Sequence, residues 1–216
     1  MNFFKGTKIL ITAGPTQEKI DDVRFISNHS SGKMGFAIAE KAFEYGAEVI
    51  LVSGPVNLKC SSGINRINVV CADDMYNATM EYFGKTDIFI MSAAVADYKP
   101  KNPVKGKIKK ETAGDSPIIE LEKTKDILFE IGKIKNDRQF LVGFALESEN
   151  LIENAIAKLQ RKNCDLIIAN KSGGDRSGFG GDYNTISIIS KNLDITDYLP
   201  MSKSDCAEII LKQIMS

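Results

Sequence analysis

Several kinds of segment are scarce in this chain of 216 residues. No run approaches the roughly 18 consecutive apolar residues of a membrane-spanning helix. The N-terminal stretch MNFFKGTKILITAG lacks the apolar run and cleavage site of a signal peptide. The four cysteines, Cys60, Cys71, Cys164 and Cys206, are far apart and form no C-x-x-C pair, which disfavours a disulfide framework or a structural zinc site. We therefore expect a cytoplasmic protein with reduced thiols and no membrane partner.

An excess of charge of either sign is also absent. Lys and Arg together number 28, as do Asp and Glu, so the formal net charge is zero. A general nucleic-acid-binding protein would carry a basic excess, and we expect no nucleic-acid partner. The hydrophobic fraction of 43% and the charged fraction of 26% are ordinary for a soluble globular protein. With no internal repeat in the chain, we expect a single domain over residues 1–216.

Short runs typical of β-strands alternate with segments of helical length. Strands are expected at KILITA (from Lys8), EVILVS (from Glu48), NRINVV (from Asn65) and DIFIMSAAVA (from Asp87), and helices from Lys33 to Gly46 and from Asp73 to about Phe83. The fourth run is apolar nearly throughout, as is typical of a strand buried on both faces. This order predicts an α/β fold of the Rossmann-like, doubly wound type, a mainly parallel sheet with helices on both faces.

The second half continues the alternation. Apolar runs occur at IIEL, QFLVGFAL and DLIIAN, with helical stretches from Asp126 to Lys135 and from Glu149 to Lys162. NTISIIS and LDITDYL, near the C-terminus, predict a β-hairpin added to the main sheet.

Two connections are longer than the usual βα loop. GPTQEKIDDVRFISNHSSG follows the first strand, and DYKPKNPVKGKIKK follows the fourth. Ligands of open α/β sheets bind at the carboxyl ends of the strands, where both connections begin. We expect these two loops to form the functional site.

The end of the first loop leads into a helix. Ser30 or Ser31 is placed to cap that helix, and Gly32 and Gly35 allow close approach of a ligand to the backbone, so the segment suits a phosphate. A plain helix cap is the alternative. The chain has neither G-x-x-x-x-G-K-[ST] nor G-x-G-x-x-G, and LVSGP ends the second strand without the acid that would bind a ribose. These absences disfavour a P-loop protein and an NAD enzyme.

Arg24 and His29 lie in the same loop. An ion pair with Asp21 or Asp22 is the default interpretation of Arg24. His29 is the only histidine and a conceivable general base, but it has no obvious partner, so we interpret it as structural.

Six lysines and no acid occupy the second loop from Lys99 to Lys110. Lys107 and Lys109 are two residues apart and would project from one side of an extended chain. Two hypotheses fit this run equally: a mobile flap that closes over phosphates, or a solvated surface loop.

The stretches ITAGPTQE, VRFISNHSSGKMG, LVSGP, SAAVADY, KIKK, KTKDIL, LVGFALE and KLQRKNCDLIIAN together resemble the phosphopantothenate–cysteine ligase family, in its stand-alone bacterial form. The resemblance covers most of the chain. It implies a coenzyme A biosynthesis enzyme that activates 4′-phosphopantothenate with CTP as an acyl-cytidylate, releases pyrophosphate, and transfers the acyl group to the amine of L-cysteine with loss of CMP. It also implies a homodimer and Mg²⁺ that accompanies the nucleotide, without metal ligands from the protein.

The resemblance assigns roles residue by residue. The catalytic group is Asn28, Lys107 and Arg24, and Lys109 and Lys110 open the flap. The nucleotide-binding group is Ser92, Ala93, Asp97, Lys107, Lys125, Asp126, Ile127, Leu128, Phe144, Lys158 and Lys162. Ser30, Ser31 and Gly32 are candidates for the phosphate of the acyl substrate. The late hairpin is a candidate for the dimer interface, and the role of the glycine-rich loop near Gly173–Gly181 stays open.

Two other functions remain as alternatives. An NAD(P)-dependent oxidoreductase on the same fold would show flavin or nicotinamide absorbance. A nucleotide-binding module without catalysis would bind CTP and form no peptide bond.

Overall fold

The main sheet of the protein has eight strands. A computed structural model describes residues 2–109, 116–147, 149–171 and 181–215. The sheet strands are β1 (Lys8–Ala13), β4 (Glu48–Ser53), β5 (Asn65–Asn68), β6 (Ile88–Met91), β9 (Phe140–Glu147), β10 (Leu166–Lys171), β12 (Ile186–Ser190) and β13 (Ile195–Asp197). Their order is β13-β12-β10-β9-β6-β1-β4-β5. The pairs from β10 to β5 are parallel, and β12 and β13 join as the antiparallel hairpin predicted from the sequence.

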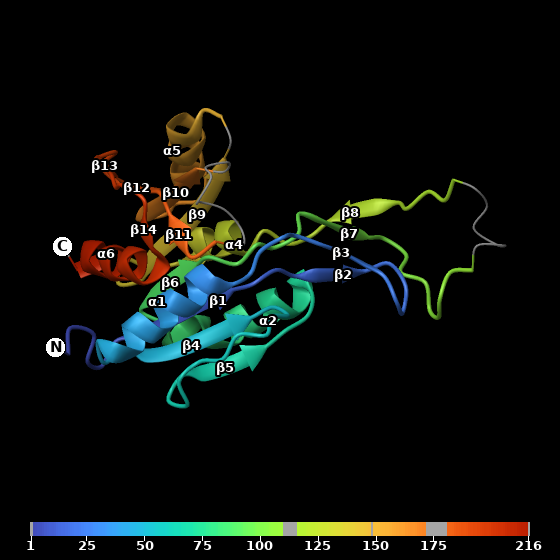
Figure 1. The fold of residues 1–216 in the computed structure, drawn as a ribbon, viewed down its shortest axis with the longest axis horizontal. Coiled ribbons are helices and arrows are strands. Elements are labelled where there is room, and N and C mark those ends of the chain that lie inside the picture. Colours follow the sequence, from blue (N-terminus) through green and yellow to red (C-terminus); the bar gives the residue numbers. More distant parts are fainter. Residues whose placement is uncertain (1, 110–115, 148, 172–180, 216) are drawn as a thin grey trace.

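Helices cover both faces of the sheet (Figure 1). One face carries α1 (Lys33–Glu44) and α6 (Lys203–Met215). The other carries α2 (Ala72–Tyr82), which continues as a short 3₁₀ turn (Phe83–Lys85), α4 (Ile127–Ile134) and α5 (Leu151–Arg161). The predicted doubly wound fold is confirmed. None of these helices, within the ranges described above, is long and apolar enough to cross a membrane.

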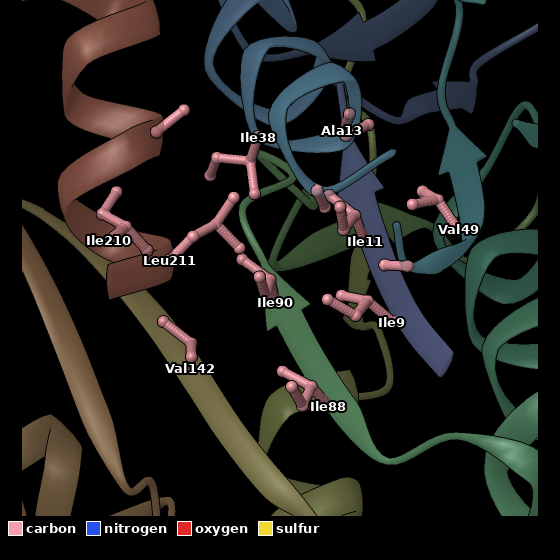
Figure 2. Close-up of a cluster of buried hydrophobic side chains, with 14 of the residues drawn as sticks. Ile9, Ile11, Ala13, Ile38, Val49, Ile88, Ile90, Val142, Ile210 and Leu211 are labelled. Carbon is pink, nitrogen blue, oxygen red and sulfur yellow. The ribbon is translucent and has the colours of Figure 1, made fainter. Parts of the chain in front are cut away.

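Alternate side chains of each central strand enter opposite layers of the core. Ile9 and Ile11 of β1 pack in the layer under α1 and α6, whereas Leu10 packs in the layer under α2, α4 and α5. Figure 2 shows part of the first layer, to which Ile9 and Ile11 of β1, Ile38 of α1 and Leu211 of α6 all contribute side chains. Burial of both faces explains why the central strands are continuously apolar in sequence.

A projecting arm interrupts this regular pattern. Two antiparallel ribbons, β2 (Gln17–Lys19) with β3 (Phe25–Ser27) and β7 (Tyr98–Pro100) with β8 (Leu121–Lys123), contact each other through β2 and β7. Figure 1 shows these four strands extending away from the main sheet, and we call them the arm. Much of both long connections therefore forms the arm, and only the parts nearest the sheet contribute to its carboxyl edge. A third ribbon joins β11 (Tyr183–Asn184) to β14 (Met201–Ser202).

Three expectations from the sequence need correction. The fourth strand, expected from Asp87 to Ala96, ends at Met91 because the chain turns and hydrogen-bonds to the segment after β1. The run IIEL is not a core strand: Ile118 is 96% exposed, and only Leu121 belongs to a strand, in the arm. Helix α6, which packs on α1, was not predicted at all.

The order of the strands fixes where a ligand site can form. From β1 the chain moves outward to β4 and β5, and it then returns to the opposite side of β1 as β6 before moving outward again to β9 and β10. Crossovers in opposite directions leave a crevice between the carboxyl ends of β1 and β6.

Close packing of α4 against the end of α5 provides a test of the fold. A Cβ atom added at Gly132 would lie 1.9 Å from the carbonyl oxygen of Lys162, whereas one added at Gly84 meets nothing within 4 Å. We predict that Gly132→Ala lowers the free energy of unfolding by about 1–3 kcal/mol through overpacking. Gly84→Ala, the matched control, should change it by less than about 1 kcal/mol. Urea denaturation measures both, and equal stability of the two variants would contradict the packing described.

Candidate functional site

Two adjoining cavities open at the carboxyl edge of the sheet. The larger, of about 680 Å³, lies between the segment after β6 and the helices α4 and α5. The smaller, of about 380 Å³, lies between the same segment and the start of α1. Both are lined by Ala93, Val95, Asp97, Phe144 and Lys158. The cavities therefore form one continuous site with a shared wall.

The shared wall is the segment from Ser92 to Asp97, which hydrogen bonds hold against the end of β1. Ser92 Oγ donates to the carbonyl of Thr12 at 2.6 Å, and the amide of Ala93 donates to the hydroxyl of Thr12 at 3.3 Å. The amide of Ala94 donates to the carbonyl of Gly14 at 2.9 Å. Asn28 is fixed to the same wall because its Nδ2 donates to the carbonyl of Ala94 at 3.1 Å. The sequence-predicted Asn28 thus lies at Ala94 and lines the same cavity as Ser92 and Ala93.

The start of α1 forms the opposite side of the smaller cavity. Ser30 and Ser31 line it, but neither caps the helix as we expected. The N-cap residue is Gly32, in the left-handed conformation with φ 77° and no side-chain cap, and Ser30 Oγ instead accepts from the amide of Gly32 at 3.3 Å. A helix start without a side-chain cap suits an anion. Gly35 leaves no room for a side chain, because a Cβ there would lie 2.6 Å from Ser92 Oγ.

Lysines dominate the far wall of the larger cavity. Lys158 Nζ donates to the carbonyl of Phe144 at 2.6 Å, and burial lowers the pKa of Lys158. Lys162 forms an ion pair with Asp126, which also caps α4 by accepting from the amide of Phe129 at 3.0 Å. Burial is the largest single effect and would raise the pKa of Asp126. The hydrogen bonds from Lys162 and from the amide of Phe129, together with the positive charges of Lys162 and Lys158, outweigh it, and the pKa is lowered. The wall therefore keeps a partly buried positive charge on Lys158 facing the cavity.

The remaining residues assigned to the nucleotide come together as the sequence suggested. Lys125, Ile127 and Leu128 line the larger cavity, and Lys125 Nζ lies 4.2 Å from the centre of the Tyr76 ring. Ser92 lines the smaller cavity.

Arg24 and Lys107 lie elsewhere. Arg24 binds Asp21 at 2.5 Å in the ion pair that we took as its default role, and it also donates to the carbonyl of Ile108. The pKa of Asp21 is held far below its usual range, mainly by that hydrogen bond from Arg24. Lys107 is exposed and lines neither cavity. His29 is also exposed and lines neither cavity.

The loop that carries Lys107 is tied to the arm where it is described. The amide of Gly106 donates to Asp22 at 2.6 Å, and the amide of Ile108 to Asp21 at 3.0 Å. Lys99 and Lys101 pair with Asp73 and Glu120. Lys110 lies outside the described residues, as does most of the glycine-rich loop near Gly173–Gly181. Closure of a flap over phosphates stays a prediction.

Some cavity residues were missed by sequence reasoning. Thr12, Thr124, Asn154 and Arg161 line the larger cavity, and Asn170, Asn184 and Lys203 the smaller one. Asn170 is the last residue of the predicted run DLIIAN, so its position near the carboxyl end of a strand was a usable signal. Lys203 begins the helix that was not predicted, and nothing in the local sequence marks Asn184.

One family model matches nearly the whole chain. The family described as DNA/pantothenate metabolism flavoprotein C-terminal domain matches residues 4–216. The coenzyme A biosynthesis bifunctional protein CoaBC of Haemophilus influenzae is 49% identical over 188 residues, which are 87% of this chain and 46% of that protein. CoaBC of Bacillus subtilis is 44% identical over 211 residues, 97% of this chain and 51% of that protein. The chain thus spans about half the length of these curated relatives.

A solved structure extends the comparison to the fold. The crystal structure of the C-terminal domain of CoaBC superposes with a TM-score of 0.84 at 42% sequence identity. The match covers 100% of this chain and 97% of that domain. The similarity therefore extends over the length of this chain.

The buried ammonium of Lys158 should cost stability in the ligand-free protein. We predict that Lys158→Met raises the free energy of unfolding at pH 7 by about 0.5–2 kcal/mol. The pKa of Lys158 is lower in the folded protein than its usual value of 10.5 in the unfolded chain. As the pH rises towards 10.5, the folded protein therefore releases this proton before the unfolded chain does. The free energy of unfolding of the wild type increases over that pH range. The advantage of Lys158→Met should therefore shrink towards pH 10.5. Urea denaturation across this range tests it, with exposed Lys212→Met as control; a destabilised Lys158→Met protein would contradict it.

Proposed function

This chain belongs to the family of DNA/pantothenate metabolism flavoprotein C-terminal domains, and we propose that it is a ligase that joins 4′-phosphopantothenate to L-cysteine in coenzyme A biosynthesis. The observation that carries the proposal is the match, over the whole chain, to the C-terminal domain of a coenzyme A biosynthesis protein. The site supports it, because Asn28, Ser30 and Asp97 of the matching motifs line one continuous pair of cavities.

The chemistry has two steps. The carboxylate of 4′-phosphopantothenate attacks the α-phosphorus of CTP, the bond to the β-phosphate breaks, and pyrophosphate leaves. The amine of cysteine then attacks the carbonyl carbon of the acyl-cytidylate, loses a proton, and expels CMP. The acyl group passes from phosphate to amine without a covalent bond to the protein, so the site needs positioning groups and positive charge rather than an activated nucleophile.

The two cavities suit the two substrates. We place CTP in the larger cavity, where Lys125, Lys158 and Lys162 supply positive charge for a triphosphate. The acyl substrate then occupies the smaller cavity. The shared wall is where the carboxylate and the α-phosphate would meet. Asn28, held at Ala94, is placed to donate to an oxygen of the acyl-cytidylate there.

The nucleotide brings a cytosine base and a metal ion to the site. Asp97 is exposed on the shared wall, and its carboxylate can accept a hydrogen bond from the cytosine amino group or the ribose. Among the described residues no group of three or more His, Cys, Asp or Glu side chains could hold a metal ion. We propose that Mg²⁺ accompanies the triphosphate.

Product analysis tests the function. The protein is incubated with 4′-phosphopantothenate, L-cysteine and Mg²⁺, with CTP or ATP at equal concentration, and the products are identified by mass. We expect 4′-phosphopantothenoylcysteine, CMP and pyrophosphate, with a higher kcat/KM for CTP than for ATP. Nucleotide binding without peptide-bond formation would favour a binding module, and nicotinamide or flavin absorbance with no ligation would favour an oxidoreductase. A higher kcat/KM with ATP would overturn the choice of CTP.

Asn28 allows an isosteric test. Asn28→Asp replaces an amide donor with a negative charge beside a phosphorylated intermediate, so we predict a loss of kcat of about 10²–10³-fold, as for removal of an oxyanion donor. The fold should survive, because the residue lies in an exposed loop. Steady-state kinetics measure the loss, with Asn192→Asp in an exposed turn as the matched control. Near-normal turnover by folded Asn28→Asp protein would exclude the assignment.

The proposed catalytic roles of Lys107 and Arg24 are supported by the family motif alone. Both lie outside the two cavities of this chain, so within one chain the loop or the arm would have to move for them to reach the nucleotide. We expect Lys107→Gln to slow formation of the acyl-cytidylate in single-turnover assays. An unchanged rate would leave the lysine run as a surface loop.

We also propose that the chain forms a homodimer through the arm. Val23, Phe25, Tyr98, Val104 and Leu121 are exposed apolar side chains on or beside its strands. The late hairpin, our first candidate for the interface, exposes Ile195 and, just beyond it, Leu199. Exposed apolar side chains that gather on one segment are typical of surfaces where proteins associate.

The two candidate interfaces can be separated. We predict that the wild-type protein sediments as a dimer and that the double variant Phe25→Asp, Leu121→Asp sediments as a monomer, because two charges would be buried in the interface. Ile195→Asp on the hairpin is the matched control and should remain dimeric. Sedimentation equilibrium at micromolar concentration measures all three. Dissociation of Ile195→Asp alone would assign the interface to the hairpin.

A further inference from the structure

The three lysines of the larger cavity are held by different kinds of partner. Lys162 pairs with the carboxylate of Asp126, and Lys158 donates to a backbone carbonyl. Lys125, two residues beyond the end of β8, forms no ion pair among the described residues. Its Nζ lies instead 4.2 Å from the centre of the ring of Tyr76, a residue of α2 that lines neither cavity. An aromatic ring therefore takes the place of a counter-ion.

A ring and a carboxylate affect a bound ammonium group differently. The negative face of an aromatic ring attracts an ammonium group whose nitrogen lies within about 6 Å of the ring centre. The ring has no net charge, so Lys125 keeps its positive charge for a ligand, whereas Asp126 offsets the charge of Lys162. An ammonium group also has three N–H donors, and those that point away from the ring stay available. Tyr76 thus holds Lys125 without neutralising it.

The ring of Tyr76 is itself fixed. It is partly buried and packs against the core layer under α2, α4 and α5. The first turn of α2 is tied to the arm at two points. The amide of Ala72 donates to the buried carboxylate of Glu18 in β2 at 2.8 Å, and Asp73 pairs with Lys99 of β7 at 2.6 Å. The core and the arm therefore hold the helix that presents the ring.

Lys125 needs such a support because its side chain is exposed. A free lysine side chain samples many rotamers, and ordering it before the ligand arrives lowers the entropy lost on binding. Lys125 lines the larger cavity only, so it lies away from the shared wall, where the α-phosphate and the acyl carboxylate would meet. A cation in that position suits the phosphates beyond the α-phosphate.

We propose that Tyr76 is a positioning residue for the nucleotide: its ring holds the ammonium group of Lys125 where that group binds the β- and γ-phosphates of CTP, which leave as pyrophosphate. Tyr76 touches no substrate and acts through Lys125. The inference rests on the proposed ligase function. It gives α2, none of whose residues lines either cavity, a part in nucleotide binding.

Calorimetric titration of CTP and of CMP, with Mg²⁺ and without the other substrates, tests the proposal. We expect Tyr76→Leu, which removes the aromatic face, to weaken CTP binding by about 3–10-fold. Binding of CMP should weaken by less than about 2-fold, because CMP lacks the outer phosphates. Tyr76→Phe keeps the ring and should bind CTP within about 2-fold of the wild type.

Tyr82→Leu is the matched control. Tyr82 ends the same helix and packs against the same core layer, and no cation lies over its ring in the part of the chain that the structure describes. This variant should therefore change the binding of neither nucleotide. A loss equal to that of Tyr76→Leu would show a general effect of α2 packing and would overturn the proposal.

A variant of the lysine separates positioning from packing. Lys125→Met removes the charge at an exposed position and should itself weaken CTP binding by about 10-fold. In that background Tyr76→Leu should weaken CTP by less than about 2-fold more, because no ammonium group is left to hold. Equal losses from Tyr76→Leu in both backgrounds, or normal CTP binding by Lys125→Met, would overturn the proposal. Tighter CTP binding by Tyr76→Leu, or equal weakening of CTP and CMP, would overturn it too.

The positioning role and the ligase function fail separately. If the wild type makes no product but Tyr76→Leu weakens CTP binding only when Lys125 is present, the ligase function is wrong and the positioning role stands. If product forms and Tyr76→Leu binds CTP like the wild type, only the positioning role is wrong. A wild type that binds no CTP would also overturn the positioning role.

Discussion

The site depends on one constraint of topology, the central position of β1 between β4 and β6. The chain leaves β1 in one direction to form β4 and returns on the other side of β1 as β6. The connections that begin at the carboxyl ends of β1 and β6 therefore run in opposite directions and leave a space between them. Thr12, next to last in β1, then fixes the rim of that space, since its carbonyl and hydroxyl bind Ser92 and Ala93. The shared wall of both cavities is thus an extension of the central sheet rather than a free loop.

The lysines buried around the cavities lower the stability of the protein when no anion is bound. The chain has zero formal net charge, yet Lys158, Lys162 and Lys203 are all partly or fully buried around the cavities. Only Lys162 among them has a carboxylate partner within ion-pair distance in the described residues, Asp126. Burial of an unpaired ammonium is unfavourable, so the bound anions supply what the free site lacks. Binding of substrate should therefore stabilise the fold more than contact area alone implies.

The strand predictions were correct for segments that are buried in the core, and they were wrong for segments that line the cavities. The runs KILITA and EVILVS coincide with β1 and β4 because both faces of these strands are buried. DIFIMSAAVA gave too long a strand because Ala93 and Val95 are apolar as cavity lining, not as strand core. The run that begins at Ile118 is apolar and therefore resembled a core strand, although Ile118 itself is exposed. The cavity residues were found through family motifs; composition and periodicity did not identify them.

Lys203 and Asn184 show why the remaining part of the site escapes local motifs. Their positions depend on the packing of α6 against α1, and small buried residues of α6, Cys206 and Ala207, belong to the core layer shared with α1. The backbone carbonyl of Asn184 is also near the Cys206 thiol, at 4.0 Å. Residues about 150 positions apart, such as Asn184 and Met34, meet only because the two helices share one face of the sheet. The site therefore depends on the C-terminal helix as a packing element as well as a source of side chains, which no motif around Asn28 can reveal.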